Sequence, residues 1–167
     1  MKCSVFIATS ADGYIATPDN DVDWLQRAGD QNADMGGHAD MGMADYMKSI
    51  DCMIMGRKCM EKISSFNLAP EDWPYGDTRI IVLSNTIKAP PNNLEGKVEM
   101  YSGEVPDLVA ELEKDGRKHA YIDGGATITS FLNLELINEM TITQAPVLLG
   151  DGIKLFGHLS KQIKLEK

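Results

Sequence analysis

The sequence has little positive charge, few cysteines and no long apolar run. Its 16 Lys and Arg residues stand against 25 Asp and Glu residues, which gives a net charge of −9 over 167 residues. Nucleic-acid binding depends on clustered cations, and no long basic run is present, so we expect no nucleic-acid partner. No apolar stretch approaches the roughly 18 residues that a membrane span requires, so we expect no membrane partner either.

The small number of cysteines excludes further classes of protein. Three cysteines without regular spacing argue against a disulfide framework and favour a reducing compartment. The N-terminal residues lack the pattern of a signal peptide, and we therefore expect a cytoplasmic protein. The cysteines share no metal-ligand spacing with the three histidines, so no metal site is predicted. No arrangement typical of a serine or cysteine nucleophile with its histidine stands out.

Strand and helix patterns alternate along a chain whose length suits a single domain, residues 1–167. Helices are predicted after the first long loop and after several strands, over residues 40–50, 57–64, 106–115 and from the glycine pair 124–125 to about 134. Apolar runs predict strands over residues 3–8, 52–55, 79–83, 98–101, 119–122 and 138–149. The last run is predicted to lie at a sheet edge or to be antiparallel. This order predicts an α/β fold with a mostly parallel sheet and antiparallel strands late in the chain.

Two glycine-bearing junctions between a predicted strand and a predicted helix carry most of the functional signal. The first is Cys-Met-Ile-Met-Gly-Arg-Lys-Cys over residues 52–59, and the second is Tyr-Ile-Asp-Gly-Gly-Ala-Thr over residues 121–127. Glycine lets a ligand approach the backbone closely, and a helix N-terminus presents free N–H groups to an anion. Two such junctions in one domain suggest a cleft for one long anionic ligand, such as a dinucleotide.

Each of these features also has an ordinary interpretation. Arg57 and Lys58 lie in the first turn of a predicted helix, where the helix dipole favours acids, so they would suit a bound phosphate or be two solvated cations. The glycine pair could simply begin a helix. Ser84 and Asn85 follow the strand over 79–83 and would flank a ligand at the end of a parallel sheet or form a polar turn.

Asp40 is the acid with the greatest functional interest, because it begins the predicted helix over residues 40–50. One interpretation is a helix N-cap with no further function. The other is a carboxyl group in a cleft wall, hydrogen-bonded to a heterocyclic substrate. Partial burial there would raise the pKa of Asp40 and suit it to relaying a proton.

Five segments, in order along the chain, resemble one known superfamily. They are Ser-Ala-Asp-Gly-Tyr-Ile-Ala over residues 10–16, Ile-Met-Gly-Arg-Lys over 54–58, Ile-Val-Leu-Ser over 81–84, Ile-Asp-Gly-Gly-Ala over 122–126 and Ala-Pro-Val-Leu-Leu-Gly-Asp-Gly over 145–152. These segments resemble the dihydrofolate reductase superfamily. The resemblance is closest to the branch that contains the reductase domain of riboflavin biosynthesis.

The resemblance implies a three-layer dihydrofolate reductase-like fold with helices on both faces of the sheet. It implies hydride transfer from NADPH to a C=N or C=O of a pterin-like or ribosylaminopyrimidine-like substrate, in a possible homodimer. In the family, a cis peptide joins the glycine pair. The implied catalytic residue is Asp40. The implied cofactor-binding residues are Ala8, Ile15, Gly56, Arg57, Lys58, Cys59, Leu83, Ser84, Asn85, Asp123, Gly124, Gly125, Ala126 and Thr127.

Two departures from the family pattern weaken these implications. Cys59 stands where the family usually has Thr, which removes one hydroxyl bond to the cofactor. Asn85 stands where many members carry a basic residue that would hold the 2′-phosphate of NADPH, so the preference for NADPH over NADH is a family expectation. Both departures favour an alternative, in which the same fold is a nucleotide- or pterin-binding module without turnover.

Overall fold

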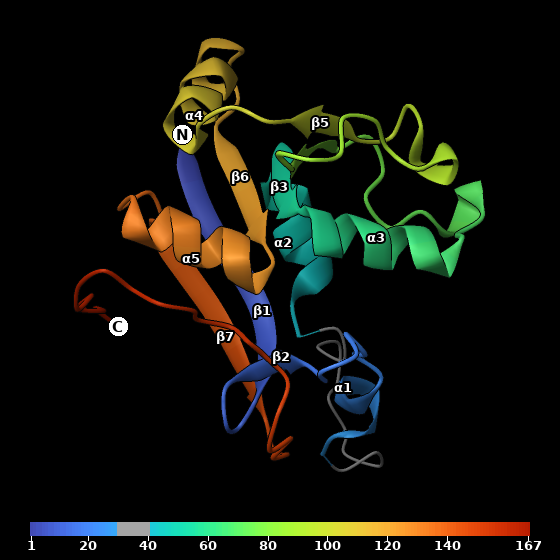
Figure 1. Cartoon of the computed structure of the whole chain (residues 1–167). Helices are drawn as coiled ribbons and strands as arrows, with labels where there is room; N and C mark the ends of the chain where they lie inside the picture. The colour runs from blue at the N-terminus through green and yellow to red at the C-terminus, as the bar shows by residue number, and fades with distance from the viewer. Residues whose placement is uncertain (30–40) are drawn as a thin grey trace.

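A computed structural model describes residues 1–29 and 41–167 (Figure 1). Its strands are β1 (Lys2–Ser10), β2 (Tyr14–Ala16), β3 (Cys52–Gly56), β4 (Arg79–Leu83), β5 (Glu99–Tyr101), β6 (His119–Asp123), β7 (Glu139–Ala145) and β8 (Ile153–Lys154). Its α-helices are α1 (Trp24–Arg27), α2 (Met43–Ser49), α3 (Arg57–Phe66), α4 (Val105–Lys114) and α5 (Gly125–Asn133). Two 3₁₀ turns cover Pro70–Asp72 and Asn92–Leu94. Asp40 lies outside the described residues.

Six strands form one central sheet in the order β5-β4-β3-β6-β1-β7, and every neighbouring pair in it is parallel. The predicted α/β fold with a mostly parallel sheet is therefore confirmed. The strand expected over residues 138–149 does lie at the sheet edge, but it pairs with β1 in parallel. The antiparallel strand is instead the short β8, which pairs with β2 in a separate two-stranded sheet.

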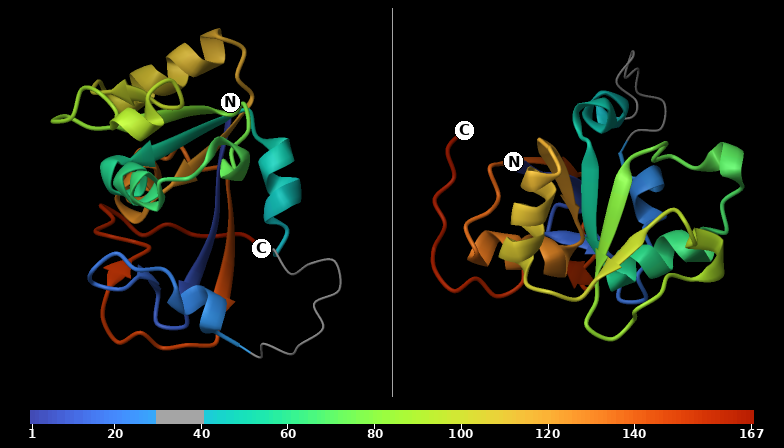
Figure 2. Two further views of the ribbon diagram at one scale, coloured as in Figure 1. Left: turned by 90° about the vertical axis from the view of Figure 1, so that its right-hand side faces the viewer. Right: turned by 90° about the horizontal axis from the view of Figure 1, so that it is seen from above.

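Helices cover both faces of the sheet, and the central strands are therefore buried on both sides. In β3, Cys52 and Ile54 face the cluster that contains the apolar residues of α4 and α5. Met53 and Met55 face the opposite cluster, which contains Met60 of α3. Figure 2 shows these two layers on either side of the strands. None of the helices among the described residues is long and apolar enough to cross a membrane.

The strand order predicts a crevice just outside the carboxyl ends of β3 and β6, where the connections diverge. From β3 the chain passes through α3 to β4, toward one edge of the sheet, whereas from β6 it passes through α5 to β7, at the other edge. The two strands are neighbours, with Met55 opposite Asp123. Ligands bind outside the carboxyl ends of parallel strands where the connections diverge in this way.

The turn after β1 is tied to the segment that precedes β8. The Asp12 carboxylate accepts hydrogen bonds from the Ser10 hydroxyl at 2.5 Å and from the backbone N–H groups of Leu149 at 3.1 Å and Gly150 at 2.8 Å. These bonds lower the pKa of Asp12, the Ser10 bond having the largest effect. They place β2 beside β8, close to the crevice.

The burial pattern leads to a prediction about stability. Leu112 of α4 is 1% exposed in the core, so we expect Leu112→Ala to lower the free energy of unfolding by about 2–5 kcal/mol. Leu148 is 74% exposed, and Leu148→Ala serves as the control with an expected change within about 0.5 kcal/mol. Urea unfolding of the three proteins measures both values. Equal losses in the two variants would contradict the assigned core.

Candidate functional site

The two glycine junctions lie side by side at the carboxyl ends of β3 and β6. A Cβ atom on Gly56 would lie 2.9 Å from the Thr127 hydroxyl of α5. A Cβ atom on Gly124 would lie 2.8 Å from the Cys59 sulfur of α3. Each glycine therefore abuts a side chain in the first turn of the other helix, and a Cβ atom at either position would require that side chain to move. One ligand can reach both helix N-termini.

Neither helix start is capped by a side chain. The N-cap residues of α3 and α5 are Gly56 and Gly124, which make no side-chain hydrogen bond, and neither first turn contains an acid. The first N–H groups of a helix have no partner within it and carry a partial positive charge. Two uncapped starts at one place are suited to an anion such as a diphosphate.

The two glycines of the second junction differ in their roles. Gly124 has φ +95° and ψ 137°, and a positive φ is strained for residues other than glycine. All peptide bonds between described residues are trans, so the cis bond that the resemblance implied is not seen. Gly125 is buried against β8, since a Cβ atom there would lie 2.6 Å from the Lys154 carbonyl oxygen. Close packing alone accounts for this second glycine.

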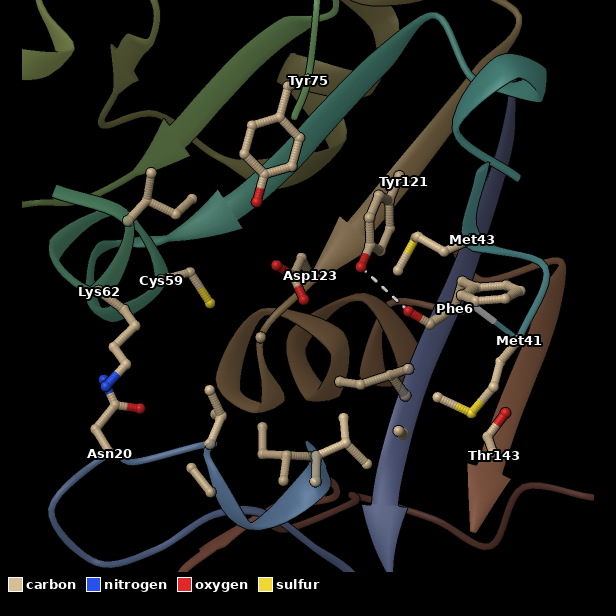
Figure 3. Close-up of a pocket in the computed structure, with 18 of the residues that line it drawn as sticks. Phe6, Asn20, Met41, Met43, Cys59, Lys62, Tyr75, Tyr121, Asp123 and Thr143 are labelled. Atoms are coloured by element: carbon tan, nitrogen blue, oxygen red, sulfur yellow. Dashed lines mark hydrogen bonds between the residues drawn. The ribbon is translucent and has the colours of Figure 1, made fainter. Parts of the chain in front are cut away.

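An apolar cavity of about 330 Å³ opens on one side of the junctions (Figure 3). Five of the predicted cofactor-binding residues line it, namely Ala8, Ile15, Cys59, Asp123 and Gly124. Apolar side chains from β1, α1 and α3 complete most of the wall. A concave apolar space of this size with few polar groups is typical of a site for a small molecule.

A second, more polar groove of about 460 Å³ lies at the carboxyl end of β4. Four other predicted residues line it, namely Arg57, Leu83, Ser84 and Asn85. The Ser84 hydroxyl accepts the N–H of Ile87 at 3.0 Å, so it also forms the polar turn that was the ordinary interpretation.

The first turn of α3 belongs to both hollows, since it contributes Arg57 to the groove and Cys59 to the cavity. Ala126 and Thr127 lie in the first turn of α5, beside this turn. Lys58 is exposed and lines neither hollow. Among the described residues, no group of His, Cys, Asp and Glu could hold a metal ion.

Asp123 is the acidic residue that the described structure places inside the cavity. Its carboxyl group points into the centre, between Cys59 and Tyr121 (Figure 3). Burial raises the pKa of Asp123 to about 6, against a smaller lowering by the N–H of Gly124. The sequence analysis assigned Asp123 to the cofactor only. The sequence did contain one signal for this buried carboxyl group, since Asp123 is an acid at the end of an apolar strand, directly before a glycine pair.

Several protonatable groups around Asp123 are held neutral. Burial, and secondarily the charge of Asp123, raises the pKa values of Cys59 and Tyr75. The same causes raise the pKa of Tyr121, whose hydroxyl donates a hydrogen bond to the Phe6 carbonyl at 3.1 Å. A cysteine acts as a nucleophile only as the thiolate, so Cys59 is suited to packing. Asp123 is therefore the group in this cavity that titrates nearest to neutral pH.

Comparison with known proteins agrees with this architecture. The family model described as the RibD C-terminal domain matches residues 2–167. The uncharacterized protein YwjB of Bacillus subtilis (strain 168) is 31% identical over 165 residues, covering 98% of this chain and 87% of that protein. A crystal structure of a putative riboflavin biosynthesis protein from Shewanella sp. PV-4 is 41% identical with a TM-score of 0.85, covering 98% of this chain and 88% of that one.

The fold extends to a more distant enzyme. Dihydrofolate reductase from Enterococcus faecalis, complexed with NADP(H) and RAB-propyl, superposes with a TM-score of 0.62 at 13% identity, covering 95% of this chain and 79% of that one. At that identity the match shows the fold alone. The expected dihydrofolate reductase-like fold is confirmed.

The close contact at Gly124 leads to a second prediction. We expect Gly124→Ala to lower the free energy of unfolding by about 1–3 kcal/mol from backbone strain, and by more from the contact with Cys59. Gly116→Ala is the matched control, because Gly116 has φ +84° but open space at its Cβ position. Urea unfolding should show a larger loss for Gly124→Ala, and part of it should return in the double variant with Cys59→Ala. Equal losses at the two glycines would contradict the assigned contact.

Proposed function

This chain belongs to the RibD C-terminal domain family, and on that basis we propose that it is a reductase that binds NADPH across the carboxyl ends of β3 and β6. The observation that carries the proposal is the meeting of two uncapped helix N-termini between an apolar cavity and a polar groove. The diphosphate would bind at the helix starts, the nicotinamide in the cavity and the adenosine half in the groove. The residues present fit a dinucleotide, because two helix N-termini without an acid in the first turn lie together between the cavity and the groove.

Arg57 supports NADPH rather than NADH. Among the described residues that line the groove it is the only charged one, and its side chain is 46% exposed, with Glu61 3.6 Å away. A guanidinium group binds phosphate through directed, charge-assisted hydrogen bonds. With a net charge of −9, the protein gives a phosphorylated cofactor no long-range attraction, so a local cation is needed. We assign Arg57 to the 2′-phosphate, and the exposed Asn85 to neutral hydrogen bonding in the same groove.

Asp123 is the proposed proton donor. Bound NADPH supplies a hydride to the carbon of a C=N or C=O, and the nitrogen or oxygen then requires one proton. The Asp123 carboxyl lies inside the cavity and holds a proton up to about pH 6, so it can donate that proton and regain one from solvent. Apolar side chains such as Phe6, Ile15 and Met43 limit the access of water to this step. Asp40 stays a predicted alternative donor.

A direct test measures cofactor binding and oxidation separately. NADPH is titrated by its fluorescence, and its oxidation is then followed by absorbance with dihydropterins and ribosylaminopyrimidines. Oxidation with one of these heterocycles is the expected result. Binding without oxidation across the panel would favour the module without turnover, and the absence of NADPH binding would overturn the proposal.

Arg57→Ala should raise the Kd for NADPH about 10-fold or more, because a charge-assisted hydrogen bond contributes about 1.5–3 kcal/mol. The Kd for NADH should change little, since NADH lacks the 2′-phosphate. Lys114→Ala is the control, because Lys114 ends α4 just before β6 begins, at the opposite end of the sheet. Fluorescence titrations of the unsubstituted protein and the two variants with both cofactors give the six Kd values. An unchanged Kd for NADPH would remove Arg57 from the site.

Asp123→Asn should lower kcat about 100-fold or more while leaving the Kd for NADPH within about 3-fold, because general acid catalysis contributes about 10²–10⁴-fold. In the unsubstituted protein the donor is lost as pH rises through about 6, so kcat should fall about tenfold per pH unit above it. A pH–rate profile checks both points. Full activity in the variant would return Asp123 to a structural role.

The same substitution should stabilise the protein at neutral pH. The folded pKa of Asp123 is raised above the ordinary value of 3.8, so its contribution to stability is present below that value and is lost as pH rises through about 6. Asparagine carries no charge to bury. Asp123→Asn should therefore increase the free energy of unfolding at pH 8 by on the order of 1 kcal/mol, with little gain at pH 4. Asp45→Asn, at an exposed site on α2, is the control.

A further inference from the structure

Helix α2 contributes to the wall of the cavity without a buried face of its own. Met43 in its first turn lines the cavity, as does Met41 shortly before it. The helix has seven residues, and none of them is buried. A helix this short is not stable by itself in water, so its position depends on contacts with the sheet. Those contacts therefore also determine where the two methionines lie.

Tyr46 packs α2 against the sheet directly behind the cavity. Its ring stacks on that of Phe6 in β1, with 4.6 Å between the centroids and 20° between the planes. It also meets the ring of Tyr121 in β6 edge-on, with the centroids 5.1 Å apart. Phe6 and Tyr121 both line the cavity, whereas Tyr46 lines a separate hollow of about 260 Å³ on the other side of Phe6. The Tyr46 ring is thus a second layer behind this part of the cavity wall.

A chain of three hydrogen bonds leaves α2 at Tyr46 and returns to it at Ser49. The hydroxyl oxygens of Tyr46 and Ser4 are 2.6 Å apart. Ser4 Oγ lies 2.7 Å from Nε2 of His119, and Nδ1 of His119 lies 3.0 Å from the Ser49 carbonyl oxygen. Ser4 belongs to β1 and His119 begins β6. The chain therefore joins the helix at two points to two adjacent strands.

The direction of the chain follows from its last acceptor. A carbonyl oxygen can only accept, so Nδ1 of His119 carries a proton, and Nε2 of the neutral ring accepts the Ser4 O–H. The Ser4 oxygen then accepts from Tyr46. Burial is the largest cause that raises the pKa of Tyr46 to about 12, so the phenol keeps the proton that it donates. Ser4 is 2% exposed, and a broken link would leave its buried hydroxyl short of a partner.

We infer that Tyr46, Ser4 and His119 form a clamp that positions α2 against the sheet, with Tyr46 as a positioning residue for the ligand of the cavity. The identity of that ligand rests on the proposed function, whereas the clamp rests on the contacts above. When a link of the clamp is removed, α2 leaves the cavity wall in a larger fraction of molecules. The apparent Kd of a cavity ligand rises in proportion, because fewer molecules are competent to bind it.

Hydrogen exchange tests the clamp without a ligand. Tyr46→Phe removes one hydroxyl and keeps the ring, and Ser4→Ala removes both bonds of the middle link. Each substitution should speed amide exchange in peptides over residues 43–50 about 5-fold, because each breaks the chain that holds the helix. The double variant should exchange no faster than Ser4→Ala. Unchanged exchange in both single variants, or a further 5-fold increase in the double variant, would overturn the clamp.

Ser49→Ala is the matched control for these variants. The Ser49 hydroxyl donates to the Tyr46 carbonyl within the same helix at 2.6 Å, and the substitution keeps the backbone carbonyl that His119 binds. Exchange over residues 43–50 should therefore stay within about 2-fold of the unsubstituted protein. An effect of Ser49→Ala equal to that of Tyr46→Phe would show general loosening of α2 and would refute the clamp.

Binding measurements on the full chain test the positioning role. Tyr46→Phe should raise the Kd of a dihydropterin, measured by calorimetry with NADPH present, about 5-fold. The Kd for NADPH should stay within about 2-fold, because α2 contributes to neither the groove nor the two helix starts. Equal rises in both Kd values would mean general damage to the site and would overturn the positioning role, and so would an unchanged Kd for the dihydropterin.

The two kinds of measurement separate this inference from the proposed function. Failure of the unsubstituted protein to bind NADPH would refute the proposed function, whereas faster exchange in Tyr46→Phe alone would still support the clamp. Oxidation of NADPH by the unsubstituted protein, with the same exchange and the same KM in Tyr46→Phe, would support the reductase and refute the clamp.

Discussion

The arrangement of the whole site depends on the close approach of two strand-to-helix corners. Gly56 and Gly124 each occupy a place where a Cβ atom would meet the first turn of the neighbouring helix at less than 3 Å. The two glycines let the adjacent strands β3 and β6 bring both helix starts together without displacing the Thr127 and Cys59 side chains. The cavity and the groove then open on either side of that point, so a single packing constraint positions both halves of the proposed cofactor site.

This constraint provides the proposed anion site of an acidic protein without a cluster of cations. The partial charges of two helix starts come from the backbone, and they act over short range whatever the net charge is. Arg57 then adds one full charge in the groove. In the apolar cavity, by contrast, no cation of the described residues forms an ion pair with Asp123, and burial raises the pKa of this carboxyl group to about 6.

The central elements could be predicted because their signals are local. The strand over 79–83 was correct to the residue, and β3 and β6 differed by one residue at the C-terminal end, since buried parallel strands are nearly continuous apolar runs. β2 and β8 were missed because each has two or three residues and a partner more than 130 residues away in the chain. The direction of β7 and the burial of Asp123 are likewise tertiary properties, which no local pattern records.

The apolar cavity wall supports the proposed chemistry, because it determines which groups in the cavity carry a proton near neutral pH. A carboxyl group keeps its proton near neutral pH only where water is scarce, and Asp123 meets that condition among aromatic and aliphatic side chains. The same burial, together with the charge of Asp123, raises the pKa values of Cys59, Tyr75 and Tyr121 and keeps these groups neutral. One set of apolar residues therefore raises the pKa of the carboxyl group toward neutrality and moves those of the thiol and the phenols further away from it.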